Sequence, residues 1–192
     1  MNMEFLIKAA TKTLIETFKK AINALTVRDK GDAEIRDTIK LRQTRPFVAK
    51  DQGYIVPKKS VFNRIIGDSH LELMFATFLE ECSDVVSYAK NYFAVHFKLD
   101  YVNADGDISN YYPDFIVKLS DKRIVIVETK GLEDLDVPLK MARLRQWCED
   151  INRVQTDVEY DFAYVDEEGF KKYNPTSFRQ LLEGFKEYKG KI

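Results

Sequence analysis

The sequence has few cysteines and glycines and no long apolar run. Its two cysteines, Cys82 and Cys148, argue against a disulfide scaffold and for a reduced, cytoplasmic chain. No apolar run approaches the roughly 20 residues of a membrane helix, and the first residues lack a signal-peptide pattern. None of the eight glycines belongs to a GxxxxGK[ST] phosphate loop, which excludes ATP hydrolysis by that route. We therefore expect a cytoplasmic protein with no membrane partner.

The charge is balanced rather than of one sign. The chain has 30 basic and 31 acidic residues, a net charge of −1, which argues against a simple nucleic-acid coat protein with a uniformly basic surface. It does not argue against a nuclease, because a metal-binding acidic centre adds negative charge and phosphate contacts need only a local basic patch. Apolar residues make up 45% of the chain, as in an ordinary globular domain.

The hydrophobic pattern predicts an N-terminal appendage followed by an α/β core. Apolar residues recur at helical intervals over residues 3–26, and residues 1–58 are expected to form a helical and extended appendage. Residues 59–192 are expected to form a mixed four-stranded sheet flanked by helices. The predicted helices cover about residues 68–82, 137–152 and 176–188, and the predicted strands about residues 89–102, 111–119, 123–130 and 160–165.

Two of these strands carry acidic residues at positions that a hairpin would bring together. If the three residues 120–122 form the loop, Leu119 pairs with Arg123, and the same register places Asp114 opposite Glu128. Directly opposed side chains lie on one face of the pair, with Cβ atoms about 4.5–5.5 Å apart. Lys130 lies two residues beyond Glu128 and projects from that same face. Two carboxylates and an amine are thus expected at the open end of the hairpin.

This combination suits metal-assisted hydrolysis of a phosphodiester. Two opposed carboxylates repel each other unless a positive charge lies between them, and Mg²⁺ typically takes one or two carboxylates and keeps several waters. Such an ion polarises a phosphoryl oxygen and lowers the pKa of a bound water. The lysine can orient that water or neutralise charge on the phosphate. An ordinary salt bridge between Lys130 and a carboxylate at a strand end is the plain alternative.

The same residues resemble the PD-(D/E)XK nuclease superfamily and, more narrowly, the C-terminal endonuclease domain of the Res subunit of type III restriction enzymes. The resemblance covers about residues 59–152. It is carried by residues 68–75 (DSHLELMF), 112–115 (YPDF) and 128–131 (ETKG), with a weaker match in residues 140–152 (KMARLRQWCEDIN).

The resemblance implies a fold, a site and partners. The fold would be restriction-endonuclease-like, with Asp114 and Glu128 as metal ligands, Lys130 as the catalytic lysine and Glu72 as a helix carboxylate that helps to hold the metal. The cofactor would be Mg²⁺, with Mn²⁺ able to substitute, and the substrate DNA. A helicase motor on the same full-length chain and a methyltransferase subunit would be the partners in restriction.

Several alternatives stay open at this point. Lys140, Arg143, Arg145 and Gln146 can contact DNA phosphates or simply form an exposed helical face. Glu133, Asp134 and Asp136 are interpreted as solvated loop charges. The chain can be a nuclease of the same fold in repair or transposition, a non-catalytic domain that binds DNA or a partner, or an RNA-directed nuclease. Cutting both strands of a duplex would need two active sites, which makes a homodimer a reasonable hypothesis.

Overall fold

The core of the protein is one mixed sheet. The computed structural model describes residues 3–26, 33–48, 52–132 and 134–185. Its strands follow the order β3-β6-β7-β8, in which β3–β6 and β6–β7 are antiparallel and β7–β8 is parallel. The predicted mixed four-stranded sheet is therefore confirmed. The bounds are Ser87–Lys90 for β3, Phe115–Ser120 for β6, Arg123–Lys130 for β7 and Glu159–Asp166 for β8.

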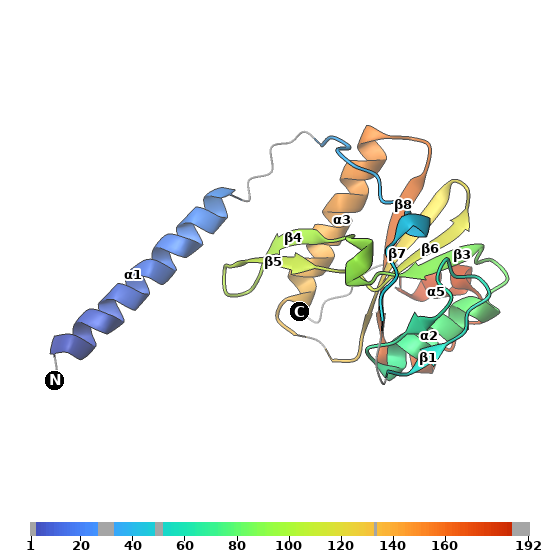
Figure 1. Ribbon diagram of the computed structural model, residues 1–192, viewed down its shortest axis with the longest axis horizontal. Helices are drawn as coiled ribbons and strands as arrows, with labels where there is room; N and C mark the ends of the chain where they lie inside the picture. The colour runs from blue at the N-terminus through green and yellow to red at the C-terminus, as the bar shows by residue number, and fades with distance from the viewer. Residues whose placement is uncertain (1–2, 27–32, 49–51, 133, 186–192) are drawn as a thin grey trace.

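Helices cover both faces of this sheet. One face packs against α2 (His70–Glu81), α4 (Glu167–Tyr173) and α5 (Phe178–Phe185), and the other against α3 (Val137–Val154). Figure 1 shows α3 on one side of the sheet and α2 and α5 on the other. Strand β7 divides the two cores, because Val125 and Val127 belong to the α2 side whereas Ile126 belongs to the α3 side. This alternation is the period of two expected of a strand buried on both faces.

Two small hairpins complete the described part of the chain. Strand β4 (Leu99–Val102) pairs with β5 (Ile108–Tyr111), and β1 (Tyr54–Ile55) pairs with β2 (Ile65–Ile66). In the turn between β4 and β5, Gly106 adopts a positive φ of 82°, which suits a residue without a Cβ. The division between residues 58 and 59 stays a prediction, and the β1–β2 pairing joins segments on either side of it.

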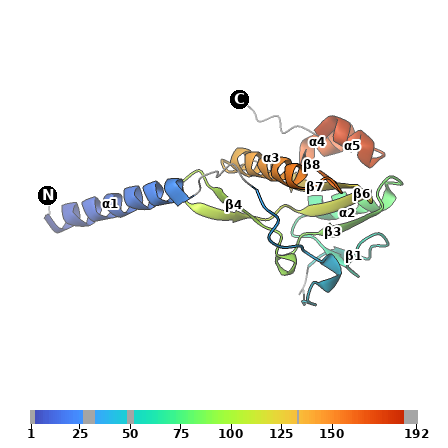
Figure 2. The same ribbon diagram turned by 90° about the horizontal axis from the view of Figure 1, so that it is seen from above.

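The long N-terminal helix lies mostly apart from the core. Helix α1 (Met3–Thr26) projects away from the sheet in both ribbon views (Figure 1, Figure 2). Its large apolar side chains are exposed; Leu14, for example, is 67% exposed. Near its end, Lys19 forms an ion pair with Asp107 (2.9 Å) and Asn23 donates to the carbonyl of Gly106 (3.0 Å) at the tip of the β4–β5 hairpin. None of the described helices is long and apolar enough to cross a membrane.

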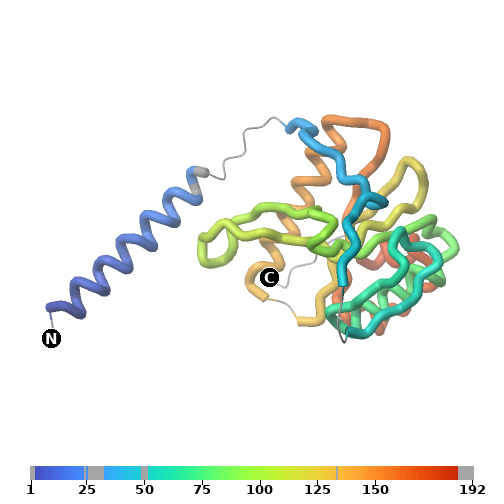
Figure 3. The backbone as a smooth tube through the Cα atoms, viewed as in Figure 1, coloured from blue at the N-terminus to red at the C-terminus, as the bar shows by residue number. Residues whose placement is uncertain are grey.

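The single strand predicted over residues 89–102 is wrong. The chain leaves the sheet after Lys90, forms the 3-10 turn η2 (Phe93–Val95) and reverses at His96, whose φ of 62° is left-handed. It then runs into β4, as Figure 3 shows along the chain path. The alternation misled because β3 and β4 each bury apolar side chains, although they belong to different sheets.

The strand predicted over residues 111–119 is also two strands. Pro113 separates β5 from β6, and a proline cannot donate to a strand ladder. Several short elements were not predicted. Among them are α4, capped by Asp166, whose Oδ1 accepts from the amide of Gly169 (2.7 Å), and the 3-10 turn η1 (Leu41–Gln43). The last helix begins at Phe178, two residues later than predicted, and its predicted end at residue 188 lies outside the described residues.

Candidate active site

The register of the β6–β7 hairpin confirms the predicted alignment over most of its length. Four pairs run from Phe115 opposite Val127 to Lys118 opposite Ile124, and one further step in this register sets Asp114 across from Glu128. The predicted turn is wrong in detail. Ser120, not Leu119, pairs with Arg123, because a bulge between Lys118 and Ser120 absorbs one residue and shortens the loop to two. The irregularity lies at the turn, so it leaves the open end of the hairpin unchanged.

Asp114 is held at both its backbone and its carboxylate. Its Oδ2 accepts hydrogen bonds from the Thr129 amide (2.8 Å) and the Thr129 hydroxyl (2.7 Å). Its carbonyl accepts from the Asn91 amide (2.7 Å), and the Asn91 side chain donates to the neighbouring carbonyl of Pro113 (2.8 Å). Burial raises the pKa of Asp114 to about 6, even though the Lys90 charge and the Thr129 hydrogen bonds act in the opposite direction. The hydrogen bonds from Thr129 and Asn91 therefore fix the position of Asp114, but they only partly stabilise its negative charge.

Glu128 is the second carboxylate of the site and, unlike the half-buried Asp114, it is buried. It lies near the end of β7, is 8% exposed, and its Oε2 accepts a hydrogen bond from the buried Tyr111 hydroxyl (3.0 Å). Burial and the neighbouring charge of Asp114 raise the pKa of Glu128 well above its usual range. The two carboxylates are close enough for Asp114 to oppose the ionisation of Glu128. Tyr111, interpreted from sequence as a packing residue, is a direct partner of the site.

Each carboxylate has one oxygen to spare. Within the described ranges, neither Asp114 Oδ1 nor Glu128 Oε1 accepts a hydrogen bond, and neither is among the fully enclosed side-chain atoms that lack a partner. Two adjacent carboxylates with free oxygens match the oxygen ligands and the ligand number that Mg²⁺ takes from a protein. The donor set thus fits one hard divalent cation.

A third carboxylate, that of Glu72, acts on this pair through its charge, which helps to raise the pKa of Asp114. Glu72 lies in the first turn of α2, where its Oε2 is 2.6 Å from Lys90 Nζ and also accepts from the Asp68 amide (2.9 Å). In the part of the chain that the structure describes, no three His, Cys, Asp or Glu side chains gather as a metal-binding group. The predicted cap of α2 is confirmed, since Ser69 Oγ accepts from the Glu72 amide (3.2 Å). The predicted role of Glu72 as a metal ligand stays a prediction.

Lys90 is a site residue that the sequence analysis missed. It is 3% exposed, and its ammonium contacts Glu72 and, at 3.4 Å, Asp68. One signal in the sequence was available. In an extended segment, Lys90 lies on the same face as Tyr88 and Tyr92, two residues before and two after it. A lysine in phase with two tyrosines indicates a buried cation that needs acidic partners.

Lys130 lies beside the carboxylate pair and is itself held in place. Its Nζ is 2.8 Å from Asp134 Oδ2. Burial lowers the pKa of Lys130, but the hydrogen bond to Asp134 and the charges of Glu128 and Asp114 outweigh burial and raise it. The interpretation of Asp134 as a solvated loop charge is confirmed, since its side chain is exposed even though it pairs with Lys130. Asp136 is half-buried and accepts from the Tyr101 hydroxyl (2.8 Å), and Glu133 lies outside the described residues.

The residues predicted to contact DNA lie on α3 at different distances from this site. Lys140 is near it, with its Nζ 4.0 Å from Asp134 Oδ2, and its charge lowers the pKa of Glu128, which burial raises. Arg143 donates to the carbonyl of Asp100 (3.1 Å), and Gln146 donates to Asp150 (3.1 Å). Of the three, only Lys140 is brought next to the carboxylates.

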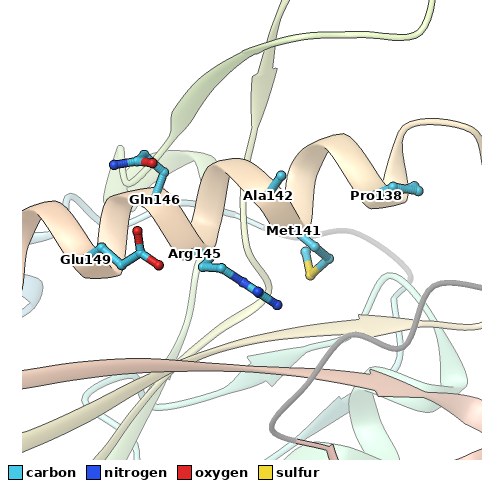
Figure 4. Close-up of a pocket in the computed structure, with 6 residues that line it drawn as sticks. All are labelled: Pro138, Met141, Ala142, Arg145, Gln146 and Glu149. Carbon is cyan, nitrogen blue, oxygen red and sulfur yellow. The ribbon is translucent and has the colours of Figure 1, made fainter. Parts of the chain in front are cut away.

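A shallow pocket runs along α3 but is separate from the carboxylate pair. Its volume is about 220 Å³, and none of the site residues lines it. Figure 4 shows its six lining residues, all on this one helix. They are Pro138, Met141, Ala142, Arg145, Gln146 and Glu149. The chemistry of the chain is therefore concentrated at the hairpin end rather than in this pocket.

No protein-family model, curated protein or solved structure matches the chain. The geometry of the site is therefore the basis for assigning a function.

Proposed function

We propose that the chain is a metal-dependent DNA endonuclease domain of the PD-(D/E)XK type, with a restriction-endonuclease-like fold. The observation that carries the proposal is the pair formed by Asp114 and Glu128: a half-buried and a buried carboxylate at the open end of one hairpin, each with an oxygen that accepts no hydrogen bond from the described residues. Burying two like charges together is unfavourable for folding. A divalent cation bound between the two carboxylates would offset their repulsion, which explains why they lie together.

In this proposal each side chain has a defined task. Asp114 and Glu128 hold Mg²⁺, or Mn²⁺ in its place, and such an ion polarises a phosphoryl oxygen and lowers the pKa of a bound water. Thr129 orients the Asp114 carboxylate, and Tyr111 orients that of Glu128. The Lys130 ammonium, held by Asp134, stabilises negative charge that develops on the scissile phosphate.

The biological setting follows from the sequence resemblance alone. It is type III-like restriction of foreign DNA, with a helicase motor on the same full-length chain and a methyltransferase subunit that recognises the site. Cleavage of both strands would need two such active sites, supplied by a homodimer or by a partner. The lysines at positions 130 and 140 supply local positive charge for the DNA backbone.

The test is cleavage of supercoiled plasmid by the purified chain in Mg²⁺. The parent should nick or linearise the plasmid, Asp114→Ala should lose the activity, and Asp121→Ala at the exposed turn of the same hairpin should keep it. Cleavage by Asp114→Ala at the rate of the parent would contradict the assignment. If no protein cleaves, the binding of Mn²⁺ to the parent and its loss in Asp114→Ala would distinguish a nuclease that needs its partners from a domain without a metal site.

A further inference from the structure

The ammonium group of Lys90 occupies a buried position between α2 and the sheet. Its Nζ lies 2.6 Å from Glu72 Oε2 and 3.4 Å from Asp68 Oδ2. The rings of Tyr92 and Phe115 flank it, each with its centroid 5.8 Å away. Lys90 is also opposite Phe115 in the β3–β6 pair, so its side chain lies on the α2 side of the sheet.

Asp114 is the electrostatic link between this lysine and the proposed metal site. Burial lowers the pKa of Lys90, and the charges of Asp114, Glu72 and Asp68 more than offset it. Of these three, Asp114 has the largest effect. On the other side of the sheet, Asp114 influences Glu128, whose partner Tyr111 belongs to the core beneath α3. Asp114 therefore has a buried ammonium on one side and a buried carboxylate on the other.

Glu72 is not free to turn away from Lys90. The same oxygen, Oε2, that contacts the ammonium also accepts the amide of Asp68, and the first turn of α2 fixes the backbone of Glu72 through Ser69. A second divalent cation bound by Asp114 together with Glu72 would have to enter the space that the ammonium fills. A divalent cation and the Lys90 ammonium, placed next to each other in a poorly hydrated site, would repel each other strongly.

We propose that the Lys90 ammonium takes the place of a second metal ion and limits the site to one divalent cation, bound by Asp114 and Glu128. This inference rests on the proposed metal-dependent function. Lys90 is a positioning residue here, since it acts through the carboxylates and not on the phosphate. Glu72 serves as the partner of Lys90 and leaves the cation to Asp114 and Glu128.

The number of bound ions tests this directly. Mn²⁺ binding to the chain without DNA is followed by electron paramagnetic resonance and by calorimetry. We expect one ion per chain for the parent and for Lys90→Arg, which keeps the positive charge. Lys90→Met removes the charge while keeping an unbranched apolar side chain, and we expect it to bind two ions. The double variant Lys90→Met/Glu72→Gln removes the carboxylate of the second position, and we expect it to bind one ion again.

Glu72→Gln alone keeps the test decisive even if Lys90→Met does not fold. With Lys90 filling the second position, Glu72→Gln should bind one ion with an affinity within about threefold of the parent. Two ions in the parent, a loss of tenfold or more in Glu72→Gln, or a single ion in folded Lys90→Met would each overturn the inference but leave a metal site at Asp114. Absence of Mn²⁺ binding to the parent would instead overturn the proposed function, and this inference with it.

Discussion

The two ends of the β6–β7 hairpin both carry an aspartate and a lysine, but the aspartates differ in exposure and in pKa. At the turn, Asp121 is solvent-exposed and pairs with Lys118 (2.6 Å), which lowers the pKa of Asp121. At the open end, Asp114 is enclosed, bonded to Thr129, and has a raised pKa. The turn end is an ordinary surface ion pair, of a kind that contributes little to stability.

The difference indicates that the carboxylates at the open end are not there to stabilise the fold. A fold gains nothing from placing a buried carboxylate, Glu128, beside the half-buried Asp114, whose charge disfavours the charged form of Glu128. Proteins retain such conflicts mainly at functional sites. The turn end therefore supplies matched controls for the open end, with Asp121 as the control for Asp114 and Lys118 as the control for Lys130.

The largest contrast is expected between the two lysines. Lys130→Ala removes the cation beside the carboxylate pair, and we expect the rate of Mg²⁺-dependent plasmid cleavage to fall about 10²–10³-fold, as when other transition-state stabilisers are removed. Lys118→Ala removes a lysine in a similar pair with aspartate and should leave the rate unchanged. Single-turnover assays at saturating enzyme measure both, and equal rates for the two variants would remove Lys130 from the mechanism.

The next contrast concerns stability without metal. The pKa of Asp114 is about 6 in the folded protein, against an ordinary value of 3.8. Between these values the folded state retains a proton that the unfolded state has lost, so stability falls as the pH rises from about 4 to about 6. Above pH 6 the penalty is fully present, and Asp114→Asn removes it. We expect Asp114→Asn to be about 1–3 kcal/mol more stable than the parent at pH 7.5.

Urea denaturation at pH 7.5 and at pH 4 checks this. The gain in Asp114→Asn should shrink at pH 4, where Asp114 is protonated in the folded parent, and Asp121→Asn should show no gain at pH 7.5. Destabilisation of Asp114→Asn at pH 7.5 would mean that the Asp114 charge supports the fold.

A smaller effect is expected of pH on metal affinity. Asp114 must lose its proton to bind a cation, and its pKa of about 6 means that Mn²⁺ affinity should fall at least about tenfold between pH 6.5 and pH 5. Asp121→Asn should follow the same curve, because the carboxylate of Asp121 is remote from the metal. Calorimetric titrations at several pH values measure it, and a flat profile would exclude Asp114 as a ligand.

The smallest effect is expected on α3. Lys140 lies next to the site, whereas Arg143 and Gln146 are bonded to Asp100 and Asp150. Lys140→Ala should weaken DNA binding in Ca²⁺ by about threefold. The slope of log affinity against log salt concentration should become shallower by about one, as expected for the loss of one phosphate contact. Arg143→Ala and Gln146→Ala should change the affinity less. Fluorescence anisotropy over a range of salt concentrations measures all three affinities. A larger loss of affinity in Arg143→Ala than in Lys140→Ala would indicate that DNA contacts α3 nearer to Arg143.

The parts of this site that depend on local sequence were predictable, and those that depend on distant partners were not. Strand β7 was predicted with its observed bounds, because it is a continuous apolar run, and the short loop after β6 set the register that aligns Asp114 with Glu128. The phase of Lys90 indicates burial, but its acidic partners Glu72 and Asp68 lie far before it in the sequence, and nothing in the spacing of residues indicates them. The Lys130–Asp134 pair is local, with an i,i+4 spacing.

Helix α1 shows the same limit on a larger scale. Its apolar residues recur at helical spacing, which predicted the helix over its observed range. In α3 a similar pattern buries Val137, Met141 and Leu144 against the sheet, whereas in α1 the large apolar residues, such as Leu14 and Phe18, are exposed. Periodicity predicts a helix and an apolar face but does not tell what covers that face.

The most direct test of the metal site is thermal denaturation with and without Mn²⁺ for the parent, Asp114→Asn and Asp121→Asn. A ligand that binds only the folded state raises the melting temperature. We predict that Mn²⁺ raises the melting temperatures of the parent and Asp121→Asn by the same amount and leaves that of Asp114→Asn unchanged. Equal shifts in all three proteins, or no shift in the parent, would contradict a metal site at the open end of the hairpin.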